Sequence, residues 1–371
     1  MDRSSKDLKI LAHKVIDSFE SFKDKNVLRD EEIGTYWTEF EFSIVDNIGK
    51  EAVQLGIREL KNCLPFLLAF NDIEMIKING ENFFKEDKEV ENGINFTFVD
   101  PVELWIIEEK SLKIAIAINR NSKKIIELQD TPRIYLKGLP IFDTGTYLKL
   151  PFVFHTNNLD TSEERNTILY PEGDEAQISK INNIIDSIFV IFFELSKKIT
   201  EANENFDCLH LLLDFDKIER DDVLNPTLKE YFNNQIFKLL KKMTNQLELV
   251  NTFTGKSKFI DTFFPLIPVD NTHSEYDRIR VLFLKLIREI EINIPVEKSL
   301  EIWRNFAKNL NEKFEGEIEI NLYTIQNLRD TLSNFIEEES NPVDFDDFKE
   351  KFKLKDVIQF LLSFYELVNI L

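Results

Sequence analysis

Arg165 is the residue whose type and surroundings could most directly do chemistry. It lies in a polar loop, among acidic residues, after a run that is typical of a buried strand (PFVFH, residues 151–155). Turn-forming asparagines and an aspartate separate this strand from the arginine. A rigid strand that ends in such a loop can present a guanidinium group to an anion. At a nucleotide γ-phosphate, an arginine of this kind can accelerate hydrolysis by about 10³ to 10⁵.

A structural interpretation of Arg165 is also open. Glu163, Glu164 and Glu172 are close to it in the sequence and could pair with it on the surface. Such an exposed ion pair would contribute about 0–1 kcal/mol to stability. Residue types alone do not decide between an anion-binding arginine and this pair.

Other common sites are missing from the sequence. Its 10 glycines form neither GxxxxGK[ST] nor GxGxxG, which excludes the two usual phosphate-binding loops. Each histidine lacks a Cys, His or carboxylate at metal-ligand spacing, so we expect no metal site. The histidines are His13, His155, His210 and His273. A nuclease-like triplet at residues 86–88 (EDK) lies in a polar run, where metal-binding carboxylates would not be held rigidly.

Composition narrows the class of protein. The chain has 371 residues and 33 phenylalanines, ample for two or three folded domains. Its formal charge of −21 disfavours nucleic acid and anionic membranes as partners. Cys63 and Cys208 lie in apolar contexts, and the sequence shows neither an N-terminal apolar leader nor a membrane-length apolar stretch. We therefore expect a cytoplasmic protein.

The first half predicts an α+β domain at residues 31–173, with a mixed, mostly antiparallel sheet and flanking helices. An N-terminal segment, residues 1–30, carries an amphipathic helix at residues 6–24. Apolar spacing predicts a helix at residues 50–62, which Pro65 interrupts. Strands are expected at residues 35–45, 73–78, 94–99, 103–108, 112–118, 124–128, 134–136 and 151–155. The predicted core is Phe40, Phe42, Leu67, Leu68, Ile76, Ile78, Phe96, Leu104, Ile106, Ile114, Ile116, Phe152 and Phe154.

From residue 174 the hydrophobic period changes from two to 3.6, which predicts an all-helical domain at residues 174–371. Helices are expected at residues 174–199, 226–247, 275–290, 296–314, 324–337 and 345–371. The last of these remains apolar to the end, with no stop signal. Its apolar residues include Phe360, Leu361, Phe364, Leu367, Val368 and Leu371. This pattern fits either a truncated chain or a docked terminus.

Several short motifs follow one another along the chain. They are YWTEF (residues 36–40), LPFLLAFN (64–71), the I-x-I at 76–78, LPIFDTG (139–145) and the segment 150–169. In this order they resemble the region that follows the ATPase domain in large bacterial GHKL-type ATP-binding proteins, a group that includes sacsin-like and heat-shock-chaperone-like proteins. Glu163, Glu164 and Arg165 provide the E-x-R spacing of that family. The helical part, with Trp303, is similar to the family's following helical region.

The resemblance implies a non-catalytic coupling region, transducer-like at residues 31–173 and helical beyond. It implies that Arg165 senses the γ-phosphate and that Glu164 and Asn166 lie at the nucleotide. ATP and Mg²⁺ are then expected only with a separate ATPase domain N-terminal to Met1, because this chain lacks the family's D-x-G-x-G motif and glycine-rich lid. The implied partners are that ATPase domain or subunit, a protein partner or client, and a second copy of the chain.

Two other interpretations stay open. The acidic charge, the aromatic residues and the apolar C-terminal helix would also suit a standalone acidic scaffold that binds partner helices or a basic protein. The family likeness also allows a component of a bacterial antiviral defence system.

Overall fold

The structure is a computed structural model that describes residues 47–91, 93–141, 148–162, 167–171, 173–202, 208–218, 225–270, 272–290, 292–338 and 345–371. The chain divides into two compact units, residues 1–54 and 55–371. The described part of the first unit, residues 47–54, is helical. The predicted helix at residues 6–24 and strand at 35–45, with Phe40 and Phe42, lie outside the described residues. The following paragraphs concern the second unit.

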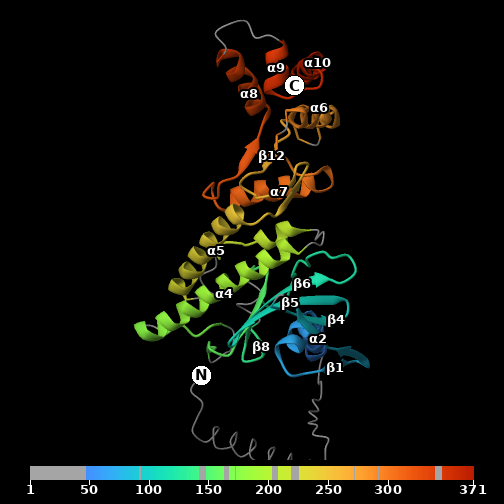
Figure 1. Cartoon of the computed structure of the whole chain (residues 1–371). Coiled ribbons are helices and arrows are strands. Elements are labelled where there is room, and N and C mark those ends of the chain that lie inside the picture. The colour runs from blue at the N-terminus through green and yellow to red at the C-terminus, as the bar shows by residue number, and fades with distance from the viewer. Residues whose placement is uncertain are drawn as a thin grey trace, which may run out of the picture. The chain divides into compact units, whose positions relative to one another are not determined.

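This unit contains a seven-stranded sheet (Figure 1). Its strand order is β3-β4-β5-β6-β9-β7-β8, and the neighbours are antiparallel except for β7 and β9. The strands are β3 (Glu86–Glu91), β4 (Ile94–Val99), β5 (Val102–Glu109), β6 (Leu112–Asn119), β7 (Ile134–Leu136), β8 (Leu139–Pro140) and β9 (Val153–Thr156). Strand β9 is inserted between β6 and β7, so that Phe154 pairs with Ile114 on one side and Ile134 on the other. The predicted α+β class with a mixed, mostly antiparallel sheet is confirmed.

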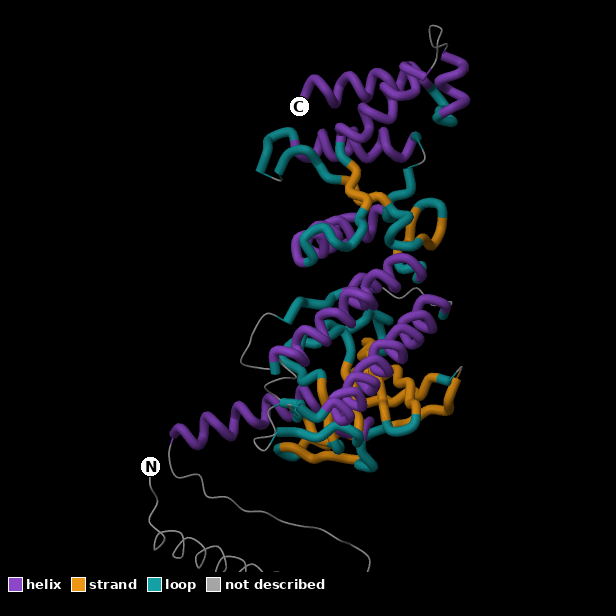
Figure 2. The backbone as a smooth tube through the Cα atoms, turned by 90° about the vertical axis from the view of Figure 1, so that its left-hand side faces the viewer, coloured by secondary structure: helices purple, strands orange, loops and turns teal. Residues whose placement is uncertain are grey.

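Both faces of the central strands are buried. Alternate residues of β5 and β6 point to opposite sides of the sheet, and each side packs against helices. Trp105, Ile107 and Ile116 join the hydrophobic cluster formed with helix α4 (Glu175–Glu201), and α5 (Pro226–Gln246) packs against α4 (Figure 2). Leu104 and Ala115 instead join a cluster with helix α2 (Asn47–Phe70). Strand β9 therefore lies in a sheet that is covered by helices on both sides. This is the strand that the sequence predicts to lead into the functional loop.

Helix α2 continues through Pro65, so the predicted interruption is wrong. A proline inside a helix removes one backbone hydrogen bond and crowds the preceding turn. Here the residues around it are buried: Leu64 and Phe66 are 1% and 2% exposed, and Phe70 packs edge-on against Tyr135 with the ring centroids 5.3 Å apart. Burial of this helix on the sheet offsets the lost hydrogen bond.

Helices form most of the C-terminal part, as predicted, but this part is not all-helical. Besides α4 and α5, the helices are α6 (Tyr276–Glu289), α7 (Glu297–Lys313), α8 (Ile325–Glu338), α9 (Phe345–Lys351) and α10 (Val357–Ile370), with a 3₁₀ turn η1 at Leu209–Leu213. Two short pairs of strands interrupt them: β10 (Val250–Thr252) with β11 (Gly255–Ser257), and β12 (Phe263–Pro265) parallel to β13 (Asn321–Tyr323). Helix α7 shares the cluster of the sheet and α4, whereas α6, α8, α9 and α10 form a second cluster. The predicted domain boundary at residue 173 stays a prediction.

The predicted helix at residues 345–371 is two helices. Lys353 adopts a left-handed backbone conformation (φ 51°), and the N–H of Leu354 returns to the carbonyl of Lys349, which ends α9. The Asp356 carboxylate then accepts a 3.0 Å hydrogen bond from the N–H of Gln359 and starts α10. The apolar periodicity hid this break because residues on both sides of it are buried.

Smaller differences concern strands near the edges. Residues 81–84 form β2, which pairs with β1 (Met75–Ile78), and 86–91 form β3; neither was predicted as a strand. The predicted strand at 124–128 is reduced to one bridge between Ile125 and Ile118. Ile76 and Phe96 are half-buried rather than core, since they lie near sheet edges; the other described members of the predicted core are buried.

Candidate functional site

The predicted site residues Glu164, Arg165 and Asn166 lie outside the described residues. The residues on either side of them are held together: Thr161 bridges Ile168, and the Ser162 N–H donates to the Thr167 carbonyl at 3.0 Å. This pairing lies soon after β9, as the sequence predicted for the loop. The assignment of a γ-phosphate sensor therefore stays a prediction.

The chain that enters β9 is fixed by Arg133. This guanidinium is buried and donates to three backbone carbonyls, those of Leu150 (2.7 Å), Thr131 and Leu128. Burial lowers its pKa to about 10. Three of its five N–H donors are used by these carbonyls, so Arg133 positions the backbone that leads into β9.

A charged junction connects this loop to the helical part. The Lys149 ammonium lies 2.8 Å from the Asp216 carboxylate, and Lys313 at the end of α7 lies 2.5 Å from Asp216 and 3.2 Å from Asp214. Burial alone would raise the pKa of Asp216, but the hydrogen bonds from Lys149 and Lys313 lower it. The same carboxylates raise the pKa of Lys313 against the effect of its burial. These pairs line a cleft of about 370 Å³ and join the loop before β9 to α7.

A buried Cys-Tyr-His group, in which the cysteine belongs to α2 and the other two residues to the sheet, could suggest nucleophilic catalysis. Burial raises the pKa of Cys63 to about 11 and lowers that of His155 to about 4. The Tyr135 hydroxyl donates to the Cys63 carbonyl at 3.5 Å, and the Gly138 N–H donates to His155 Nε2 at 3.1 Å. Both shifts favour the uncharged forms at neutral pH, a protonated thiol and a neutral imidazole, which disfavours a thiolate nucleophile or an imidazolium acid here.

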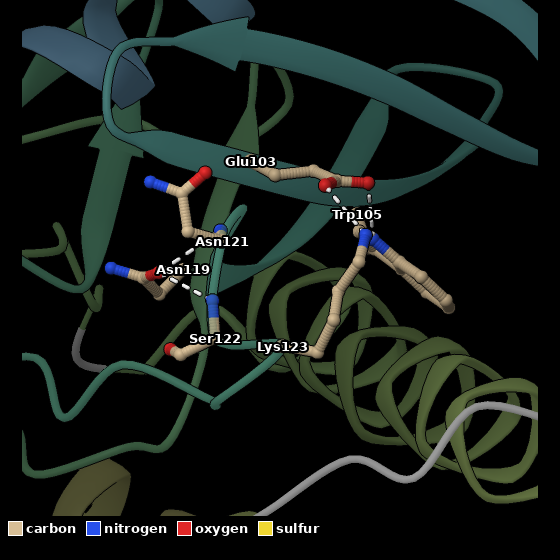
Figure 3. A network of polar contacts seen from close by, with 6 residues as sticks. All are labelled: Glu103, Trp105, Asn119, Asn121, Ser122 and Lys123. Atoms are coloured by element: carbon tan, nitrogen blue, oxygen red, sulfur yellow. Dashed lines mark hydrogen bonds and ion pairs between the residues drawn. The ribbon is translucent and has the colours of Figure 1, made fainter.

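Glu103 is a buried carboxylate, 4% exposed, and each of its two oxygens accepts a hydrogen bond (Figure 3). Trp105 Nε1 donates to one oxygen at 3.1 Å, and Lys123 Nζ donates to the other at 3.2 Å. Lys123 reaches it because Asn119 shapes the turn after β6, accepting hydrogen bonds from the N–H groups of Asn121 and Ser122. A carboxylate with both oxygens paired stabilises the turn and is a poor general base or metal ligand.

Within the described ranges no three His, Cys, Asp or Glu side chains gather as a metal-binding group. The helices of this part of the chain include none long and apolar enough to cross a membrane.

Helix α10 is the clearest candidate for an interaction surface. One side of it is buried against α6: Val357, Phe360 and Leu367 are at most 7% exposed. Lys285 of α6 donates to the Ser363 hydroxyl at 3.0 Å, and Arg278 of α6 contacts the Glu366 carboxylate at 2.6 Å. These contacts fix the rotation of α10 about its own axis.

The opposite side of α10 is apolar but uncovered. At 100° per residue, six exposed side chains fall on one arc of about 120°, and five of them are apolar; the sixth is Asn369, near the end of the helix. The apolar ones are Ile358, Leu361, Leu362, Tyr365 and Val368, and they are 65%, 37%, 57%, 68% and 50% exposed. We call these five residues the apolar α10 face. Glu366 is the one charged side chain of the helix, and it lies at the rim, paired with α6.

Sequence reasoning noticed the apolar helix but did not separate its two sides. In the sequence, Leu361 and Val368 belong to one apolar run with the buried Phe360 and Leu367. A helical-wheel plot of residues 357–370 would have shown two opposed apolar arcs, although only packing tells which arc is covered.

No protein-family model matches the chain, and no curated protein matches it significantly. The function therefore has to be inferred from the residues of this chain and their geometry.

Proposed function

We propose that this chain is a non-catalytic interaction and coupling region that associates through the apolar α10 face. The observation that carries the proposal is a helix with one apolar side packed in the core and a second apolar side in solvent. Exposed contiguous apolar patches on folded proteins mark interaction surfaces. The surrounding chain has a net charge of −21, yet this face carries no charged residue.

The occupant we propose is α10 of a second copy, packed antiparallel about a two-fold axis. The spacing of the face, i, i+3, i+4, i+7 and i+10, is self-complementary, as an isologous contact requires. At roughly 100 Å² for each side chain, the pair would bury on the order of 1,000 Å² in total, which is the lower limit for a specific interface. We therefore expect a reversible dimer in the micromolar range rather than an obligate one.

The coupling part of the proposal is supported by the charged junction and by the sequence resemblance. Lys149, Asp216 and Lys313 connect the loop before β9 to the end of α7, so a displacement of that loop would be transmitted to the helical part. The resemblance to GHKL-type proteins supports a separate ATPase domain or subunit as the source of that displacement. In this proposal ATP and Mg²⁺ are bound by that domain, with Arg165 sensing the γ-phosphate and Glu164 and Asn166 beside it.

Replacing Leu362 and Tyr365 together by glutamate is expected to abolish the dimer. Both side chains are more than half exposed in the monomer, so the free energy of unfolding should change by less than about 1 kcal/mol. Sedimentation velocity from about 1 to 100 μM should show concentration-dependent dimerisation of the wild type and a monomeric double variant. Raising the salt concentration should strengthen the wild-type dimer, because it screens the repulsion between two acidic chains.

Val190 supplies the matched control. It is an apolar residue of α4 that is 57% exposed, so Val190→Glu adds a charge at similar exposure away from α10. This variant should dimerise like the wild type. A wild type that stays monomeric at 100 μM, or a control that is as monomeric as the double variant, would overturn the proposed occupant.

The chain by itself is expected to hydrolyse no ATP above background. Reconstituted with its ATPase domain, the Arg165→Ala variant should lower turnover at least tenfold while ATP affinity stays unchanged, because a sensor acts in the transition state. Turnover by the isolated chain would contradict a non-catalytic role. Turnover that is insensitive to Arg165→Ala, with the α10 dimer intact, would favour the alternative of a standalone acidic scaffold.

A further inference from the structure

A second site lies between α6, α7 and the loop at residues 266–270, in a cleft of about 700 Å³. One wall is apolar and is formed by Leu266, Ile267, Pro268 and Val269. The other wall is polar and comes from the two helices, with Tyr276 and Arg280 on α6 and Glu301 and Arg304 on α7. Clefts of this size, with one apolar wall and a few converging polar groups, are typical of sites for small molecules.

A single carboxylate in this cleft is shared by two guanidinium groups. Glu301 Oε2 lies 2.6 Å from Arg304 Nη2, and Glu301 Oε1 lies 3.2 Å from Arg280 Nε. The arginine side chains are 18% and 26% exposed, respectively. One carboxylate cannot neutralise two guanidinium groups, so the pair keeps one positive charge in partly desolvated surroundings, where Coulomb attraction is stronger than in water.

The arginines also keep unused donors. Each guanidinium has five N–H groups. Arg304 donates to the Tyr276 hydroxyl at 3.3 Å and contacts Glu301. Arg280 Nε is buried, and it finds no hydrogen-bond acceptor among the described residues even though Glu301 is near. The cleft therefore has donors and charge available for an incoming anion.

The charge balance of the cleft selects the kind of anion. Lys308, which also lines the cleft, is paired with Glu312 at 3.9 Å, and Asp270 adds a second carboxylate to Glu301, so the two arginines are the cations that remain for a ligand. A monocarboxylate fits the planar fork of an arginine in a bidentate manner and brings less negative charge beside Glu301 and Asp270 than a dianion or a polyphosphate would.

We propose that this cleft binds a monocarboxylate with an apolar or aromatic body. The carboxylate bridges Arg280 and Arg304, and the body lies against the apolar wall at residues 266–269. Glu301 holds the two arginines in place when the ligand is absent and competes with it for the same donors. The site is distinct from the apolar α10 face and does not depend on it.

Phenylbutyrate serves as the probe, with its neutral amide, phenylbutyramide, and inorganic phosphate as comparison ligands. Saturation-transfer NMR and calorimetric titration on the full chain should show binding of phenylbutyrate and at least tenfold weaker binding of the other two. Arg280→Gln should weaken phenylbutyrate binding at least tenfold, because the bidentate charge-assisted contact is lost. This variant should fold, since the contact that it loses is a partly exposed ion pair with Glu301, and Glu301 keeps its 2.6 Å contact with Arg304.

Two further variants separate a binding site from a structural ion cluster. Glu301→Gln removes the competing carboxylate and should tighten phenylbutyrate binding about three- to tenfold, whereas a merely structural role of this residue predicts no gain. Arg329→Gln, at an arginine of α8 that is 65% exposed, is the matched control and should bind like the wild type. Equal binding of the amide, no saturation at about 10 mM phenylbutyrate, or unchanged affinity in the folded Arg280→Gln variant would overturn the proposal.

Discussion

Phe152→Ala is expected to lower the free energy of unfolding by about 3–5 kcal/mol. The ring of Phe152 is fully buried and stacks on Phe192 of α4 with a centroid distance of 4.3 Å. It also meets Phe189 and Phe215 edge-on, at 6.2 and 6.3 Å. Removing it would leave a cavity at the point where the sheet, α4 and the segment after η1 meet. Neighbours in three different elements cannot all collapse into that space.

Urea unfolding followed by circular dichroism and tryptophan fluorescence would measure this loss. Phe84→Ala, at a phenylalanine of β2 that is 54% exposed, is the matched control and should cost less than about 1 kcal/mol. Phe154→Ala should resemble Phe152→Ala, since Phe154 is equally buried. A Phe152→Ala loss no larger than that of Phe84→Ala would contradict the packing described here.

The second large effect concerns pH and His155. Burial, with a smaller contribution from the positive charge of Lys113, lowers the pKa of His155 to about 4. The unfolded chain, in which the pKa is about 6.5, then binds more protons than the folded chain between these two values. Stability is therefore retained above pH 6.5 and lost as the pH falls toward 4. The linked loss from this residue should reach about 2 kcal/mol between pH 7.5 and pH 5.

The measurement is the free energy of unfolding at several pH values for the wild type and for His155→Gln. Glutamine can still accept the hydrogen bond from the Gly138 N–H but does not titrate. The many carboxylates of the chain titrate in both proteins, so the difference between the two curves isolates His155. Parallel curves would show that this histidine is not held neutral in the folded chain.

The sequence contained most of the information about the strands and helices near the sheet centre. The alternation over β4, β5 and β6 located these strands within one residue, and the aromatic run PFVFH marked the chain at β9. The prediction worked here because both faces of these strands are covered, so that most of their buried positions are apolar; Glu103 is an exception, and its carboxylate is paired with Trp105 and Lys123. It failed at β2 and β3, since edge strands are half-exposed and tolerate charged residues.

Functional sites were harder to predict from the sequence than helices and strands, because a site depends on which segments pack together. Arg165 was selected by residue type and neighbourhood alone, and its role stays a prediction. The cleft between α6 and α7 had no comparable signal: Glu301 and Arg304 are visible as a helical i, i+3 pair, but nothing local indicates that Arg280 meets them. That contact exists because α6 and α7 pack beside the loop at residues 266–270.

The sequence by itself determined the α+β class, the acidic charge and the apolar nature of the last helix. Only the tertiary structure decided that α2 continues through Pro65, that β9 lies between β6 and β7, and that one side of α10 stays in solvent. The physical reason is the distance along the chain over which the interactions act. Propensity and periodicity are properties of neighbouring residues, whereas the choice of which apolar side is covered depends on segments far apart in the chain, such as α6 against α10.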